Sequence, residues 1–420
     1  MKNKIYFLLI SVIMFFFSAV GYGQEYKLIT GKVEDLETKK PLSYASVSLI
    51  NTTISNITNS DGVFTLKIPL NADNADSLNI RYIGYIGVNV AVTEFEGKKI
   101  KHVGLTPSVI ALRGVTVRPE DAITLFNLAF LNENIKKNYP QKTCGLTGFY
   151  REIIKKGNQY ITLNEAVLDI SKASYTDFSN DQLAIYKGRG NQNVKINDTL
   201  FLKLQGGPIS TMYVDLVKNS FIGTDLLSAP MYYNFWMGPN VYKDGATIYT
   251  IQFNQKDSIN ETLFRGKIFI ESESLAIVRA EFSMNVEDNP KAWREFVTKK
   301  PDNLKLGVDY ANYVINYKKY NNKWYFDYAR IDLKFNAKYK GKFLKNKYTI
   351  VSELAVTDIK NNIVPKLDTK KRIRPKDVMS SKVNDFTDNN FWENYNIIEP
   401  DESIENIISK IIKQLKKRSN

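Results

Sequence analysis

The chain of 420 residues carries 58 lysine and arginine side chains against 44 aspartate and glutamate side chains, which gives a formal net charge of +14 at pH 7. This charge favours binding to anionic lipid headgroups, acidic glycans or an acidic protein partner. The single histidine, His102, and the single cysteine, Cys144, exclude an internal disulfide and leave no His/Cys ligand set for zinc. No Walker loop and no dinucleotide fingerprint is present, so the sequence predicts no cofactor, no metal and no catalytic residue.

The first 23 residues have the order of a secretory signal peptide. Lys2 and Lys4 precede an apolar run at 5–20, and "GYG" at 21–23 fits a cleavage site. This run is shorter than the roughly 20 residues that a spanning helix needs, and an uncleaved anchor is the alternative. We expect the mature chain to begin at Gln24, which has no thiol for a lipid anchor. The protein is therefore predicted to be exported and not a lipoprotein, and nucleic acid is not an expected partner.

Residues 24–117 are predicted to form an antiparallel β-sandwich. Short runs with the period of a half-buried strand start at Lys27, Tyr44, Gly62 and Ser77, and no helical pattern interrupts them. The stretch "TNSDGVFTLKIP" could be a metal loop or a hairpin, but Asp61 offers one carboxylate where calcium needs six to eight oxygens. We interpret it as a turn, which Asn, Asp and Gly favour.

The same region resembles the carboxypeptidase-regulatory-like domain over roughly residues 27–117. The resemblance is carried by Gly31, Val33, Leu42, Ala45, Val47, Leu49, Thr58, Asp61, Gly62, Phe64, Tyr82, Gly84 and Tyr85, and by the segment "IALRGVTV" that follows. It implies a prealbumin-like sandwich, a non-catalytic accessory module found in exported proteins and outer-membrane transporters of Bacteroidota. It also implies a periplasmic protein associated with the outer membrane, with an outer-membrane protein or an envelope complex as partner.

Residues 118–400 are predicted to form a larger, curved antiparallel sheet or half-barrel. A helix with a broad apolar side runs from Glu120 to Pro140 and is expected to cover this sheet. Long alternating runs separated by hairpin-like breaks follow, so neighbours in sequence should pair. The glycine-containing stretch "KGRGNQN" at 187–193 is interpreted as a loop.

Two weaker resemblances concern this second region. The runs "YTIQF", "FRGKIFIESESLAIVRAEFSMN" and "KWYFDYARIDLKF" resemble the meander of lipoprotein-carrier half-barrels. The segments "GFYREIIKK" and "DFTDNNFWENYNIIEPDESIENIISKI" resemble a C-terminal domain of unassigned function that follows the regulatory-like module in exported Bacteroidota proteins. Neither resemblance implies a specific activity.

Residues 401–420 have the pattern of an amphipathic helix. Ile404, Ile408, Ile411 and Leu415 share its apolar side, and basic residues gather near its end, as the helix dipole favours. The helix could dock on the second domain, or it could bind a partner or an anionic membrane surface.

Two further sets of residues are candidates for a site. The aromatic residues Tyr232, Tyr233, Phe235 and Trp236 could line a ligand groove or lie in the core beneath a loop. Carboxylates could form an acid and base pair of the glycosidase type if they face one cavity, and the candidates are Glu152, Glu165, Asp169, Glu271 and Glu273. A Ser-His-Asp or Cys-His site would have to use His102, which lies in a strand-like segment of the sandwich.

These patterns leave three functions open. The first is a non-enzymatic envelope protein that acts as an interaction or accessory module for an outer-membrane transporter or assembly machine. The second is a lipid or lipoprotein carrier that uses a half-barrel cavity. The third is a carboxylate-dependent glycan hydrolase.

Overall fold

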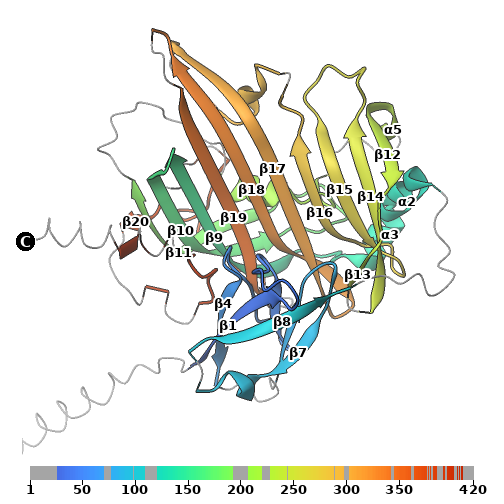
Figure 1. The fold of residues 1–420 in the computed structure, drawn as a ribbon, viewed down its shortest axis with the longest axis vertical. Helices are drawn as coiled ribbons and strands as arrows, with labels where there is room; N and C mark the ends of the chain where they lie inside the picture. The colour runs from blue at the N-terminus through green and yellow to red at the C-terminus, as the bar shows by residue number, and fades with distance from the viewer. Residues whose placement is uncertain are drawn as a thin grey trace, which may run out of the picture.

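The computed structural model describes most of the chain after the first 25 residues. The described residues are 26–70, 77–97, 99–108, 121–192, 207–219, 228–243, 245–287, 289–297, 302–341, 345–360, 364–375, 377, 379, 382–385, 391–392, 395–401, 404, 406 and 408–409. They form a mainly β structure with two small N-terminal sheets and one large sheet (Figure 1). The predicted fold class is confirmed.

The two small sheets pack face to face as a β-sandwich. One has the order β4-β1-β8-β6 and the other the order β3-β2-β5-β7. The strands are β1 (Tyr26–Asp35), β2 (Ser46–Leu49), β3 (Ser55–Ile57), β4 (Val63–Pro69), β5 (Ser77–Arg81), β6 (Tyr85–Ile86), β7 (Val88–Ala91) and β8 (Lys101–Pro107), with the short helix η1 (Val92–Phe95) before β8. Inward side chains such as Val33, Phe64 and Leu78 are fully buried between the sheets. The sandwich departs from the antiparallel prediction in one pair, because β1 and β8 run parallel.

The stretch "TNSDGVFTLKIP" is a turn that leads into β4. The Asn59 side-chain oxygen accepts hydrogen bonds from the backbone N–H groups of Asp61, at 3.0 Å, and Val63, at 2.8 Å. Gly62 has a φ of +75°, a value that an L side chain rarely adopts. Asn59 therefore caps the turn through its side chain, and Gly62 supplies the positive φ, as the turn prediction expected.

The large sheet has 12 strands within the described residues, in the order β12-β14-β15-β16-β17-β18-β19-β9-β10-β11-β20, with β13 beside β14. The strands are β9 (Cys144–Lys156), β10 (Gln159–Lys172), β11 (Gln182–Gln192), β12 (Tyr233–Met237), β13 (Val241–Lys243), β14 (Ala246–Gln255), β15 (Phe264–Glu271), β16 (Ile277–Met284), β17 (Leu304–Tyr320), β18 (Lys323–Tyr339), β19 (Asn346–Lys360) and β20 (Asn384–Asp385). Among the described strands, β12 and β20 are the two ends of this order and do not pair with each other. The sheet is therefore open, like a half-barrel, and all its pairs except β11–β20 are antiparallel.

The interpretation of residues 187–193 as a loop was wrong. Residues up to Gln192 belong to β11, which pairs with β10 along its length. Only glycine fits at positions 188 and 190 without a steric clash. A Cβ atom on Gly188 would lie 2.6 Å from the side chain of Val383, and one on Gly190 would lie 2.5 Å from it. The glycines thus allow a segment from far along the chain to approach the strand.

One face of the large sheet, here called the helix face, carries Tyr150 and Glu152 of β9. In the part of the chain that the structure describes, four helices cover it: α2 (Ala122–Phe130), α3 (Asn132–Asn138), α4 (Gly207–Tyr213) and α5 (Ala229–Tyr232). A short helix, η2 (Ala292–Glu295), follows β16 in sequence. No helix among the described residues is long and apolar enough to cross a membrane.

The predicted single helix between Glu120 and Pro140 is broken at Leu131. This residue has extended backbone angles (φ −55°, ψ 135°) and ends α2 one residue before α3 begins. The Asn134 side-chain amide donates to the carbonyls of Ala129, at 3.1 Å, and Leu275, at 2.9 Å. A polar side chain thereby satisfies a carbonyl that the break leaves without a helical partner.

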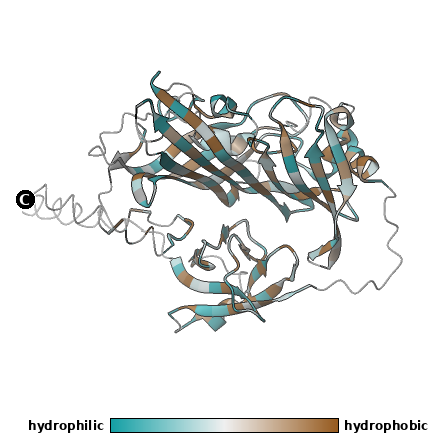
Figure 2. Cartoon of the chain, turned by 45° about the horizontal axis from the view of Figure 1, so that its top comes forward, coloured by the Kyte–Doolittle hydropathy of each residue, from teal (hydrophilic) through white to brown (hydrophobic). Residues whose placement is uncertain are grey.

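The opposite face of the large sheet, here called the sandwich face, carries Phe149, Arg151 and Ile153 of β9. The sandwich lies against this face, and the helices lie on the other side of the sheet (Figure 2). The Tyr44 ring stacks on Tyr328 of β18 at a centroid distance of 5.5 Å. A strap of the chain, the described residues 391–392 and 395–401, also lies here, with Trp392 packed on Phe149.

Candidate functional site

The helix face contains a cavity of about 530 Å³ with a mainly apolar lining. Its lining comes from strands β9 and β15 to β19, from α4, and from Glu295 of η2 with the neighbouring Phe296. The apolar side chains that line it are Ile209, Tyr213, Val214, Phe264, Phe282, Phe296, Tyr313, Ile331 and Leu333. Ligand cavities of roughly 300–1,000 Å³ with few polar groups are typical of small-molecule binding sites.

Three rings on neighbouring strands build one wall of this cavity. Phe282 of β16 is directly opposite Tyr313 of β17, and the two rings stack at 5.0 Å. Phe264 of β15 meets both of them edge-on, at 5.6 Å from Phe282 and 6.1 Å from Tyr313. Aromatic pairs across strands stabilise a sheet by roughly 0.2–1 kcal/mol each, so these contacts stabilise the wall without a ligand.

Glu152 is a polar group in the wall of this apolar cavity, and it is only 5% exposed. Burial raises the pKa of its carboxyl group above the usual value of 4.5. The Asn164 amide and the Tyr150 hydroxyl each donate to it at 3.1 Å and lower the pKa, but they do not offset burial. Its protonated form can donate a hydrogen bond to a carbonyl or ether oxygen of a bound ligand.

Glu165 belongs to a different environment on the sandwich face. Arg151 contacts one of its oxygens at 2.6 Å, and Arg189 contacts the other at 2.8 Å. Burial raises the pKa of Glu165, but the two guanidinium groups outweigh burial, so that the pKa is lowered. This carboxylate is charged and fully paired, and we interpret it as a structural group.

The candidate carboxylates do not form the acid and base pairs that the hydrolase hypothesis requires. Glu152 is directly opposite Asn164, and Glu165 is directly opposite Arg151. Since Arg151 and Glu152 are successive residues of β9, Glu152 and Glu165 project from opposite faces of the sheet. Asp169 forms an ion pair with Lys360 at 2.8 Å, and Glu271 forms one with Lys319 at 3.6 Å. Glu273 is exposed in the turn that follows β15.

The four aromatic candidates belong to α5 and to β12. Tyr233 is buried, and Phe235 packs on Phe126 of α2 at a centroid distance of 4.7 Å. Tyr232 is half-buried against the same core, whereas Trp236 is 44% exposed. All four are described residues, and none of them lines the cavity of the helix face.

The C-terminal candidates are only partly within the described residues. Ile404 is buried against Ile153 and Leu163 on the sandwich face, and Ile408 packs on the same cluster. Ile411 and Leu415 lie outside the described residues. His102, the unique histidine, lies at 3.2 Å from Glu34 within the sandwich. The described residues contain no group of three or more His, Cys, Asp or Glu side chains that could hold a metal.

Sequence reasoning named Glu152 as a candidate but missed the aromatic residues that line the cavity. Phe264, Phe282 and Tyr313 each occur in a run that was predicted as a strand, but no single run shows that the three rings meet. The available signal was one aromatic residue in each of three successive runs that alternate between polar and apolar residues. Its interpretation required the register between the strands, which only the structure supplies.

Comparison with known proteins assigns the N-terminal part of the chain. Residues 29–117 match the family model of the CarboxypepD_reg-like domain, which confirms the resemblance seen in the sequence. This match covers the sandwich and leaves the large sheet unassigned. No curated protein matches the chain.

Solved structures that align with the chain do so at low similarity. A LolA superfamily protein from Nitrosomonas europaea has 10% identity and a TM-score of 0.22, with 58% of this chain and 97% of that chain covered. A DUF1329 family protein from Desulfovibrio piger has 11% identity and a TM-score of 0.23, with coverages of 58% and 94%. MucB in complex with MucA(peri) has 8% identity and a TM-score of 0.18, with coverages of 61% and 100%. Similarity at this level assigns neither a fold nor a function.

Proposed function

We propose that this protein is a non-enzymatic binding protein that holds an apolar ligand, such as a lipid or an acyl chain, on the helix face of its large sheet. The observation that carries the proposal is the cavity of about 530 Å³ lined by Phe264, Phe282, Phe296 and Tyr313. Burial of the ligand's apolar surface supplies the binding free energy, at roughly 25 cal/mol for each Å² removed from water.

Glu152 gives the proposed ligand a polar contact. Beside a hydrocarbon chain alone, the Glu152 carboxyl group keeps only its protein partners Asn164 and Tyr150, whereas a polar group near the chain can form a further hydrogen bond with it. Buried polar groups in an apolar site favour ligands that satisfy them. We therefore expect an acylated ligand with a polar group near the chain.

The cavity can be tested by filling it. Ser210 of α4 is half-buried and lines the cavity, so Ser210→Trp places an indole inside the space that the ligand would occupy. We expect Ser210→Trp to weaken binding of the fluorescent apolar probe 1-N-phenylnaphthylamine by at least about tenfold, which corresponds to about 1.4 kcal/mol. Fluorescence titration gives the affinity, and thermal unfolding verifies that the variant is folded.

The matched control is Ser179→Trp, which adds the same ring at an exposed position in the turn after β10. It should bind the probe like the wild type. Equal affinities for the wild type and a folded Ser210→Trp variant would exclude the cavity as the binding site.

The cellular role that we propose is in the bacterial envelope, with the protein in the periplasm and associated with the outer membrane. The signal-like order of residues 1–23 supports export, and mass spectrometry of protein from the native host should find an N-terminus at Gln24 without an acyl group. An intact Met1 in the purified protein would argue against export by cleavage.

The native binding partner can be identified from the same preparation. Affinity purification from detergent-solubilised envelopes, with analysis of both proteins and lipids, should recover an acyl lipid with the protein. Recovery of a stoichiometric outer-membrane protein without lipid would favour the accessory role for a transporter or assembly machine, which the CarboxypepD_reg-like domain supports.

A further inference from the structure

The cavity of the helix face differs in charge from the chain that contains it. The described residues that line it include two carboxyl groups, those of Glu152 and Glu295, and no lysine, arginine or histidine. Any charge that these residues carry at pH 7 is therefore negative, although the whole chain has a formal net charge of +14. The sign of a ligand's charge thus affects its binding here independently of its apolar surface.

Glu152 has no cationic partner among the described residues. Its two hydrogen-bond donors, the Asn164 amide and the Tyr150 hydroxyl, each lie 3.1 Å away and are uncharged. Burial therefore raises the pKa of Glu152, whereas two guanidinium groups lower the pKa of Glu165 on the other face of the sheet. The ionised form of Glu152 lacks the counter-charge that Glu165 has.

The second carboxyl group, that of Glu295, lies where the cavity meets solvent. Glu295 ends η2, is exposed, and forms no ion pair within the part of the chain that the structure describes. Burial and, after it, the negative charge of Glu295 raise the pKa of the Tyr313 hydroxyl, so this charge acts on the aromatic wall. The face of an aromatic ring also attracts a cation that lies within about 6 Å of its centroid.

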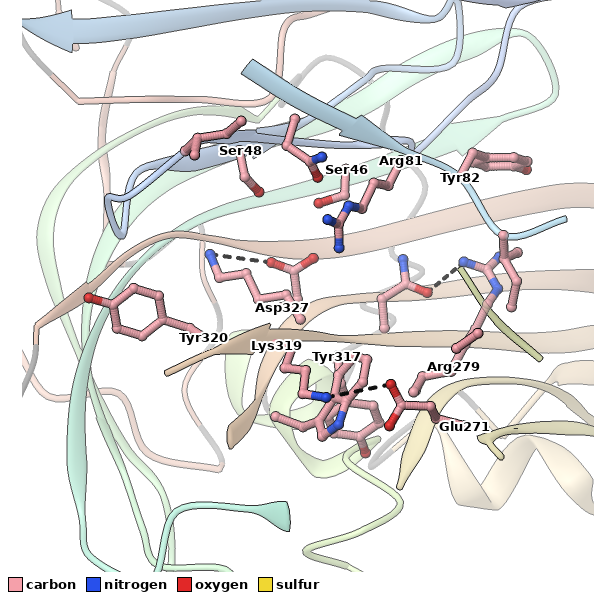
Figure 3. A pocket seen from close by; sticks show the side chains of 18 of the residues that line it. Ser46, Ser48, Arg81, Tyr82, Glu271, Arg279, Tyr317, Lys319, Tyr320 and Asp327 are labelled. Carbon is pink, nitrogen blue, oxygen red and sulfur yellow. Dashed lines mark hydrogen bonds and ion pairs between the residues drawn. The ribbon is translucent and has the colours of Figure 1, made fainter. Parts of the chain in front are cut away.

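Carboxylates in the other large cavity already have counter-charges. That cavity, of about 630 Å³, lies between the sandwich and the large sheet (Figure 3). There Glu271 lies 3.6 Å from the Lys319 ammonium group, and Asp327 lies 3.5 Å from that of Lys318. Of these two cavities, the one on the helix face is therefore the one whose described carboxyl groups are left for a cationic ligand.

We propose that the cavity of the helix face selects cationic amphiphiles, in which an ammonium group lies beside an acyl or alkyl chain. This inference rests on the proposed function, because the chain of the ligand occupies the same aromatic cavity. The ammonium group supplies the counter-charge that Glu152 lacks, and Glu295 adds attraction at the opening. An anionic headgroup would instead bring like charges together in a site removed from water, which opposes its binding.

Competition against the fluorescent probe separates the charge of a ligand from its chain. Decyltrimethylammonium, decyl sulfate and 1-decanol have the same alkyl chain with a positive charge, a negative charge and no charge. Each is added, below its micelle-forming concentration, to the protein with bound 1-N-phenylnaphthylamine. We expect decyltrimethylammonium to bind at least about tenfold more tightly than decyl sulfate. Non-specific attraction to the positively charged chain would give the opposite order.

Two substitutions and one control assign this preference to the carboxyl groups. Glu152→Gln should lower the ratio of the affinity for decyltrimethylammonium to that for 1-decanol by about tenfold. Glu295→Gln should lower this ratio by less, because solvent screens an exposed charge. Glu273→Gln neutralises an exposed carboxylate that does not line the cavity, and it should leave the ratio unchanged. Thermal unfolding verifies that each variant is folded.

The pH dependence provides a second readout. The quaternary ammonium group does not titrate, and the groups that contact Glu152, those of Asn164 and Tyr150, stay neutral because burial raises the pKa of Tyr150 well above 10. The affinity for decyltrimethylammonium should therefore rise as the pH rises through the raised pKa of Glu152, where the carboxyl group ionises. Glu152→Gln should flatten this rise.

Two results would overturn the inference and leave the proposed function standing. One is displacement of the probe by 1-decanol with decyltrimethylammonium binding no more tightly than decyl sulfate. The other is an unchanged affinity ratio in both folded carboxyl variants. If neither the probe nor any of the three compounds binds, the proposed function fails and the inference fails with it. The outcomes for the two are therefore distinguishable.

Discussion

At the scale of single residues, two glutamates on paired strands have opposite roles. Glu165 is buried between Arg151 and Arg189, and Glu165→Gln removes the charge that both guanidinium groups share. Since the loss of one partner leaves a buried charge uncompensated, we expect the variant to lose about 3–5 kcal/mol of unfolding free energy at pH 7. Urea unfolding gives this value. The lowered pKa of Glu165 predicts that the loss disappears as the pH falls through that pKa, because the wild-type carboxylate then becomes protonated.

Glu152→Gln is the matched variant on the other face. The raised pKa of Glu152 means that the folded protein holds this proton more tightly than the unfolded chain does, so stability falls as the pH rises from the usual value of 4.5 toward the raised pKa. The amide that replaces the carboxyl group cannot ionise, so the stability of this variant relative to the wild type should increase with pH over that window. Urea unfolding at several pH values measures the difference, and a difference that does not change with pH would contradict the raised pKa.

At the scale of elements, the strap at residues 391–392 and 395–401 joins the two domains. Trp392 is 5% exposed, its ring meets Phe149 edge-on at 5.4 Å, and the Arg189 guanidinium lies 4.9 Å from the ring. The Arg151 guanidinium also donates to the Ile398 carbonyl at 2.8 Å, which ties the strap to the ion cluster. The strap is thus as much a part of the interface as either domain surface.

Trp392→Ala tests the strap. Loss of a buried tryptophan side chain costs about 3–5 kcal/mol, and we expect a decrease of that size in the unfolding free energy. Trp236→Ala is the control, because Trp236 is 44% exposed at the sheet edge and its loss should cost far less. Equal effects of the two substitutions in urea unfolding would show that the strap does not stabilise the interface.

The elements also show how far the sequence predicts this molecule. Alternating runs predicted the strands of both domains, because a two-residue period is a local property. Beside the break at Leu131, Asn134 contacts the distant Leu275, and the glycines of β11 contact the distant Val383, so a local pattern shows neither contact. The apolar cavity escaped prediction for the same reason, since Phe264, Phe282 and Tyr313 meet only through the pairing of three strands.

At the scale of the whole molecule, one sheet separates an apolar cavity from a charged interface with the sandwich. Successive residues of a strand point to opposite faces, so β9 supplies Glu152 to the apolar cavity and Arg151 to the sandwich face. A one-residue shift in strand register would exchange these environments and place charged groups in the cavity. The bulges that the pairs β17–β18 and β19–β9 contain are therefore part of what keeps each chemistry on its own face.

The strap also sets the order in which the molecule can be completed. The Asn56 and Asn59 side chains of the sandwich donate to the carbonyls of Ile397 and Pro400, contacts that span 341 residues. A chain that is synthesised from its N-terminus has the whole sandwich available long before these carbonyls exist. Contacts between distant residues also close late, because the entropy of the intervening loop opposes them. We therefore expect the sandwich to fold before the strap adds its contacts to the interface between the domains.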